Sequence, residues 1–100
     1  MQSLVIASFP AQEGKLGELK QLFKDALPDT RAFDGCLAID VYVEEGTETI
    51  YLVEDWETLE HYEKYLNWRM ETGLAEMLDP ILAGGADALS IYRCGVKEDI

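Results

Sequence analysis

Two kinds of hydrophobic periodicity follow one another along this chain, and their order restricts the fold more than any other feature. Apolar side chains recur at every second position in residues 35–43, which is typical of a β-strand. Residues 48–56 predict another strand through Ile50, Tyr51, Leu52 and Val53. The acidic, glycine-containing segment 44–47 between them predicts a hairpin turn. Short apolar runs predict two further strands, at residues 3–9 and 86–93.

Helical periodicity separates these strands. Apolar residues at three- and four-residue steps predict an amphipathic helix over residues 13–27, which Pro28 is expected to end. Thr58 is the expected N-cap of a second helix that weakens at Gly73, and residues 74–82 predict a short helical segment. The expected apolar stripe of the second helix consists of Leu59, Tyr62, Leu66 and Met70.

The resulting order, strand-helix-strand-strand-helix-strand, predicts a ferredoxin-like α+β fold with both helices on one face of a four-stranded antiparallel sheet. The other face then needs cover, because consecutive strand side chains point to opposite faces. Apolar side chains expected to need such cover are Tyr51, Val53, Leu89 and Ile91. A second copy of the chain would provide it, so we expect a homodimer that forms a dimeric α+β barrel.

Composition limits the number of domains and the class of partner. The 100 residues are 48% hydrophobic, which is enough for one core, so residues 1–100 are expected to form a single domain. A formal net charge of −12 argues against nucleic acid and membrane surfaces as partners. Cys36 and Cys94 form no CxxC pair and lack neighbouring histidines, which predicts buried free thiols and no metal site. Without a leader or an apolar span, the expected location is cytoplasmic.

Aromatic residues are crowded between the third strand and the second helix. Five of them fall within eighteen residues: Tyr51, Trp56, Tyr62, Tyr65 and Trp68. Together they are expected to line an apolar pocket for a flat organic ligand, with Glu54 and Arg69 as its polar groups. Two simpler interpretations stay open, namely that the rings only fill the core and that Glu54 and Arg69 form a structural ion pair.

Two further polar residues are weaker candidates. Asp40 interrupts the apolar register of its strand, which indicates either a buried functional carboxylate or an exposed edge position. His61 lies off the apolar stripe of the second helix, so we expect it to face solvent. With one histidine and no phosphate loop, hydrolase and nucleotide-binding motifs cannot be assembled.

Several segments together resemble the antibiotic biosynthesis monooxygenase family. They are residues 31–36 with their Gly-Cys, the Glu-x-Trp of residues 54–56 and the aromatic helix segment 62–68. The resemblance covers nearly the whole chain. It implies a dimeric α+β barrel that oxidises a small quinol, phenol or polyketide-like substrate with O₂ and uses neither metal nor flavin.

The resemblance also implies a site between the sheet and the second helix, around Trp56, Tyr62, Tyr65 and Arg69. Many quinol-oxidising relatives place a histidine nine residues after the tryptophan, where this chain has Tyr65. Haem-degrading relatives pair the tryptophan with a strand-one Asn and a helix-two His. Strand one here offers only Ala7 and Ser8, which argues against haem degradation.

Two rival functions remain open at this point. One is a non-catalytic dimeric barrel that binds a small aromatic or isoprenoid molecule in the same pocket. The other is a cofactor-free isomerase or lyase, which needs only one positioned acid or base.

Overall fold

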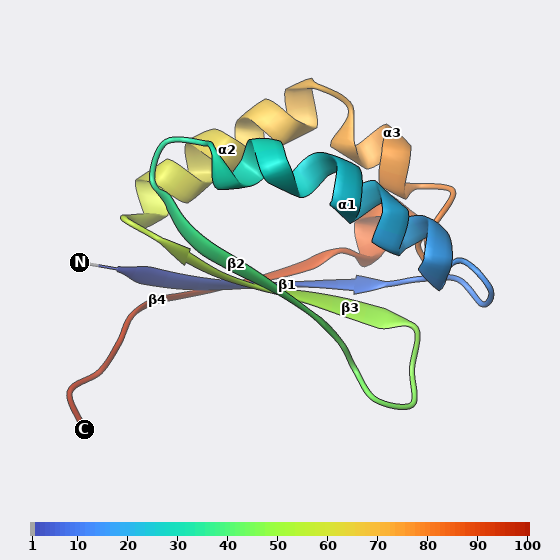
Figure 1. Cartoon of the computed structure of the whole chain (residues 1–100), viewed down its shortest axis with the longest axis horizontal. Helices are drawn as coiled ribbons and strands as arrows, with labels where there is room; N and C mark the ends of the chain where they lie inside the picture. The colour runs from blue at the N-terminus through green and yellow to red at the C-terminus, as the bar shows by residue number, and fades with distance from the viewer. Residues whose placement is uncertain (1) are drawn as a thin grey trace.

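A computed structural model describes residues 2–100, which form an antiparallel sheet with α-helices on one of its faces (Figure 1). The expected ferredoxin-like α+β order is confirmed. The elements are β1 (Ser3–Pro10), α1 (Leu16–Arg31), β2 (Cys36–Val43), β3 (Thr49–Trp56), α2 (Leu59–Glu71), α3 (Leu74–Leu78), the 3₁₀ turn η1 (Ala86–Ala88) and β4 (Ser90–Val96).

The sheet has the strand order β2-β3-β1-β4, so β1 and β3 are central. Burial alternates along both central strands, as expected for strands with one covered face. β3 points four residues at the helices: Ile50, Leu52, Glu54 and Trp56. Three of these are apolar and one is a carboxylate, and the candidate site is built around that exception.

Two apolar clusters fill the space between the sheet and the helices. The larger contains the edge-to-face pair of Phe9 and Phe23, whose ring centroids lie 4.8 Å apart, together with Leu19, Leu78 and Leu82. The smaller is built on Val5, Trp56 and Tyr62. Met70, expected on the buried stripe of α2, is instead 42% exposed, because the helix turns Tyr62 and Arg69 inward.

The sequence predicted that α1 ends at Pro28, but the helix continues to Arg31. Proline lacks an N–H, so only one hydrogen bond of the preceding turn is lost. The last turn is held by tertiary contacts: Thr30 is buried, and Arg31 donates from Nη2 to the Ile39 carbonyl at 3.2 Å. Thr58 does cap α2 as expected, accepting from the His61 N–H at 3.1 Å.

The end of the chain also differs from expectation. The short helix ends at Leu78 rather than at residue 82, and residues 86–88 form a 3₁₀ turn instead of the start of a strand. Gly84 and Gly85 both have positive φ and reverse the chain there. β4 then runs through Gly95 to Val96, because these residues pair with the first residues of β1.

In the described part of the chain, residues 2–100, all helices lie on one face of the sheet, and the second face carries none (Figure 1). Tyr51 and Val53 point to this open face, together with Tyr42 and Tyr92, which are 57% and 55% exposed. Cys94 is exposed on the same face, so the expectation of a buried thiol there is wrong for the single chain. Leu89 and Ile91, expected on this face, line the helix side instead.

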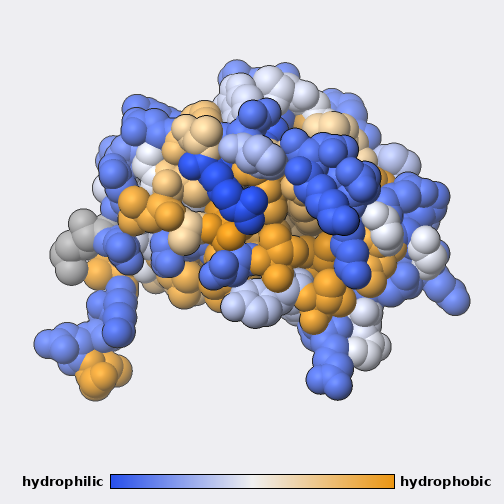
Figure 2. Space-filling view, in the orientation of Figure 1, coloured by the Kyte–Doolittle hydropathy of each residue, from blue (hydrophilic) through white to orange (hydrophobic). Residues whose placement is uncertain are grey.

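Apolar side chains are also visible where α1 passes over the edge strand β2 (Figure 2). Val41 and Val43 of that strand are 42% and 38% exposed. No helix within residues 2–100 combines the length and apolar character needed to cross a bilayer.

Candidate functional site

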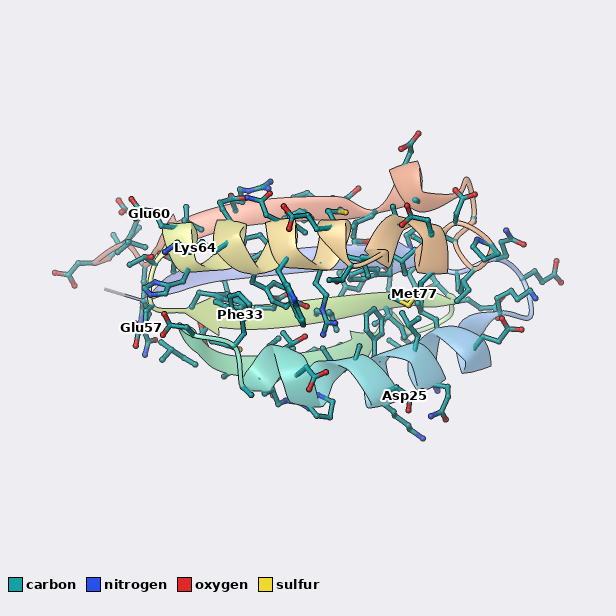
Figure 3. All side chains as sticks on the ribbon, turned by 90° about the horizontal axis from the view of Figure 1, so that it is seen from above. Asp25, Phe33, Glu57, Glu60, Lys64 and Met77 are labelled. Carbon is teal, nitrogen blue, oxygen red and sulfur yellow. The ribbon has the colours of Figure 1, made fainter. Side chains whose placement is uncertain are left out.

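A cavity of about 310 Å³ lies between the sheet and the helices. Its floor is formed by Ala7, Phe9, Leu52 and Glu54 of the two central strands. Seen from the helix side, α1 runs beside α2 and α3, with Phe33 and Met77 in the gap between them (Figure 3). The helix residues that line the cavity include Phe23 and Leu27 of α1, Tyr62, Tyr65 and Arg69 of α2, and Met77 of α3. The cavity therefore has mostly apolar and aromatic walls with a few polar groups, as binding sites for flat organic molecules do.

Glu54 is the buried carboxylate of this cavity, with an exposed fraction of 3%. Its Oε1 accepts a hydrogen bond of 2.9 Å from the indole N–H of Trp56, two residues along the same strand face. Burial raises the pKa of Glu54 from 4.5 to about 7 and outweighs the indole hydrogen bond, which lowers it. Such a carboxyl exchanges protons near neutral pH and is a stronger base than an exposed glutamate.

Trp56 is fully buried and does not itself line the cavity. Its ring packs against Tyr62 and Tyr65, with centroid distances of 5.6 and 5.1 Å. Trp56 was predicted to lie on the pocket wall, but it lies one layer behind the wall. Its contacts fix the carboxylate of Glu54 and the rings of α2.

Tyr62 and Tyr65 line the cavity as expected. Burial raises the pKa of both phenols, and the neighbouring Glu54 charge raises them further. The Tyr65 hydroxyl lies 2.8 Å from Thr30 Oγ1 and accepts a 3.0 Å hydrogen bond from Arg69 Nε. Both phenols therefore stay protonated at neutral pH and act as hydrogen-bond donors rather than as bases.

Arg69 is 8% exposed and reaches from α2 to α1. Its Nη2 donates to the Ala26 carbonyl and to Thr30 Oγ1, both at 2.7 Å. The ion pair with Glu54 that the sequence left open does not form: no acidic oxygen in residues 2–100 lies within 4.0 Å of this guanidinium. Arg69 is instead held by uncharged acceptors on α1.

The structure does not bring Asp40 to the cavity. Asp40 pairs with Val53 on the open side of the sheet and is exposed on the edge strand, which was the simpler of its two interpretations. His61 also lies outside the cavity, where its Nδ1 is 2.7 Å from Thr58 Oγ1. Its ring packs against Gly35, which has a φ of +90° and leaves no space for a Cβ atom.

Sequence reasoning missed Thr30, which connects Tyr65 and Arg69. Its spacing from Phe23 and Leu27 places it on the buried face of α1, so the period of the helix contained the signal. It was hidden by the assumption that the helix ends at Pro28. In the described part of the chain, no three His, Cys, Asp or Glu side chains are grouped as metal ligands would be.

Glu54→Gln should stabilise the fold at neutral and alkaline pH. Between pH 4.5 and about 7 the native state binds more protons than the unfolded state, so stability falls as pH rises. Above about pH 7 the buried charge costs about 3 kcal/mol, and glutamine avoids this cost. Urea unfolding should show near-equal stability at about pH 4.5 and a gain of about 3 kcal/mol for the variant at about pH 8. Glu45→Gln, which changes an exposed glutamate, is the control. An equal gain in that variant would show that the effect comes from the loss of a negative charge in general and not from the burial of Glu54.

The sequence model of the antibiotic biosynthesis monooxygenase family matches residues 3–69, which include β1 to β3 and most of α2. No curated protein matches the chain closely enough to be counted as a relative.

Solved structures share the fold at low sequence identity. A protein from Shewanella oneidensis superposes with a TM-score of 0.80 at 18% identity, covering 95% of this chain and 90% of its own. A protein from Mycobacterium tuberculosis has a TM-score of 0.74 at 20% identity, covering 99% and 98%. A structure described as an antibiotic biosynthesis monooxygenase has a TM-score of 0.78 at 16% identity and covers both chains completely.

Proposed function

The chain belongs to the antibiotic biosynthesis monooxygenase family, and we propose that it oxidises a small phenol or quinol with O₂ in the cavity between sheet and helices. The observation that carries this proposal is the buried carboxylate of Glu54, held by the Trp56 indole on the floor of an aromatic cavity. The proposed reaction uses neither metal nor flavin, because an ionised phenol can itself give electrons to O₂.

In the proposed reaction Glu54 takes the proton of a substrate hydroxyl. The resulting phenolate donates electrons to O₂, and a ring carbon that carries hydrogen forms a new bond to oxygen. The O–O bond then breaks: one oxygen atom remains as a new carbonyl, and the other leaves as water with the two hydrogens lost by the substrate. Substrate plus O₂ thus balances quinone plus water, and no outside reductant is needed.

The other residues of the cavity would orient the substrate and exclude water. Tyr62 keeps its proton and can donate a hydrogen bond to an oxygen atom of the substrate, while Tyr65 supplies an aromatic wall. Apolar walls such as Phe9 and Leu52 keep the reactive intermediate away from solvent.

The test is oxygen uptake with a panel of quinols and polyphenols, with chelator present throughout. We expect uptake that survives the chelator and equals the substrate consumed. Glu45→Gln, which changes an exposed carboxylate in the turn between β2 and β3, outside the cavity, should behave as wild type. Loss of uptake on chelation, or no uptake with any member of the panel, would contradict the proposal.

A second candidate is a non-catalytic protein that binds a small aromatic or isoprenoid molecule. It is favoured by Tyr65, which occupies the position where many quinol-oxidising relatives have a histidine and is tied to Thr30 and Arg69. For this function we expect saturable quenching of tryptophan fluorescence without oxygen uptake. Turnover of any ligand that binds would exclude it.

We also propose that the open face of the sheet packs against a second copy of the chain. The helices cover one face only, while Tyr42 and Tyr92 leave more than half of their surface exposed on the other. Apolar faces of this kind mark association sites, and a two-fold pair would cover the same residues on both copies.

Val53→Glu should convert the dimer to a monomer. Val53 lies on the open face between Ile6 of β1 and Asp40 of β2, so the substitution places a carboxylate in the middle of the proposed interface. Sedimentation should give twice the chain mass of 11.3 kDa for wild type and the single mass for the variant. A wild-type protein that stays monomeric at micromolar concentration would contradict the dimer.

A cytoplasmic location is part of the same proposal. Cys36 and Cys94 are both free, as expected where the surroundings keep thiols reduced. Fractionation of cells should recover the protein with the cytoplasmic contents, and recovery from a secreted or periplasmic fraction would contradict this location.

A further inference from the structure

Arg69 is a buried cation without an anionic partner. It is 8% exposed, and among residues 2–100 no carboxylate oxygen lies within 4.0 Å of it. Buried charges are normally paired, because an uncompensated charge loses its hydration. The hydrogen bonds to Ala26 and Thr30 satisfy individual donors but do not neutralise the charge.

Part of the guanidinium remains available to a ligand. Nε donates to Tyr65 and Nη2 to Ala26 and Thr30, whereas Nη1 has no partner in the described part of the chain. Within residues 2–100 every fully buried side-chain nitrogen and oxygen has a partner, so Nη1 must keep some accessible surface. Arg69 is also one of the residues that line the cavity.

The guanidinium is also held in a fixed orientation. Its Cζ lies 4.5 Å from the ring centroid of Trp68 and 5.4 Å from that of Tyr65. A planar fork that is already ordered loses little freedom when it binds a planar carboxylate. The contacts that hold Arg69 between α2 and α1 use only Nε and Nη2. They leave the positive charge without a negative partner, and a bound carboxylate would supply one.

Two acidic residues of α1, Asp25 and Asp29, also line the cavity. Both are exposed, and neither pairs with Arg69. Because the two carboxylates are exposed, water and salt screen their repulsion of a bound anion more than they screen the attraction by the buried guanidinium. Their presence disfavours multiply charged anions such as phosphate esters and leaves a single carboxylate as the suitable group.

We infer that Arg69 binds a carboxylate group of the ligand, so that the substrate is an aromatic acid that also carries a phenol or quinol hydroxyl. The carboxylate lies at Arg69, and the hydroxyl faces Glu54 on the floor of the same cavity. The identity as a substrate rests on the proposed function, whereas the anion site does not.

The test compares binding of naphthoate and naphthamide, which have nearly the same shape, differ in charge and lack the hydroxyl needed for oxidation. Binding is measured by quenching of tryptophan fluorescence at about pH 6, where Glu54 of the same cavity keeps its proton and naphthoate is ionised. We expect naphthoate to bind at least about tenfold more tightly, the usual effect of a hydrogen bond to a charged group. Arg69→Gln should remove this preference. Arg31→Gln, which removes a cation outside the cavity, should retain it.

A second measurement does not depend on the variants. In the NMR spectrum of the wild type, the side-chain Nε–H resonance of Arg69 should move with naphthoate and much less with naphthamide. Equal binding of the two compounds, or a preference that survives in folded Arg69→Gln, would overturn the inference. If Arg69→Gln does not fold, the wild-type preference and the Nε–H shift decide.

The outcomes also separate this inference from the proposed function. A preference for naphthoate without oxygen uptake by any hydroxylated acid would retain the anion site and reject the monooxygenase. Oxygen uptake with uncharged quinols, together with no preference for naphthoate, would retain the monooxygenase and reject the anion site.

Discussion

Glu54→Gln should lower kcat/KM for a phenolic substrate by about 10²- to 10⁴-fold, the usual contribution of a positioned general base. Glutamine keeps the size of the side chain and its acceptor for the Trp56 indole, but it cannot take a proton. Because binding is retained, the loss should fall on kcat more than on KM.

The dependence of this reaction on pH gives a second readout. In wild type, kcat/KM should rise with pH through about 7 as the Glu54 carboxyl ionises. The residual rate of Glu54→Gln should lack this rise, and the exposed-turn variant Glu45→Gln should keep it. A Glu54→Gln variant within about threefold of wild type would show that another group removes the proton.

Trp56→Ala should lower the free energy of unfolding by about 3–5 kcal/mol, as truncation of a fully buried aromatic ring does. The total stability of a domain of this size is about 5–15 kcal/mol, so much of it would be lost. Urea unfolding followed by circular dichroism measures the loss. Trp68→Ala, which truncates a half-buried tryptophan on α2, should cost less. Equal losses would contradict the central position given to Trp56.

Trp56→Phe separates packing from hydrogen bonding at the same position. The ring remains, but the indole N–H that lowers the pKa of Glu54 is gone. The pKa of Glu54 should then rise, and the pH profile of kcat/KM should move to higher pH. A purely structural role of Trp56 would reduce stability without moving the profile.

The sequence predicted the order of the elements because periods of two and of 3.6 residues are local properties. It failed at several element boundaries, and two of these depend on tertiary contacts. α1 passes Pro28 because Thr30 is buried against α2, and β4 extends to Val96 because the first residues of β1 pair with it. Neither contact can be seen in the neighbouring sequence.

The candidate site was predictable in part. Strand alternation correctly placed Glu54 and Trp56 on one face, and Tyr62 and Tyr65 line the cavity as expected. The partner of Arg69 was not predictable, because it depends on how closely α1 approaches α2. The sequence did not decide whether Asp40 is buried or exposed, because both faces of the sheet were expected to be covered.

Labelling with heavy-oxygen O₂ in ordinary water tests the central claim most directly. The assay uses the quinol or phenol that gives the highest oxygen uptake in the panel, and its product is analysed by mass spectrometry soon after turnover. We predict one labelled oxygen atom in each product molecule and the other in water, with the labelling lost in Glu54→Gln. A product without label, or uptake that ends as labelled hydrogen peroxide, would contradict a monooxygenase.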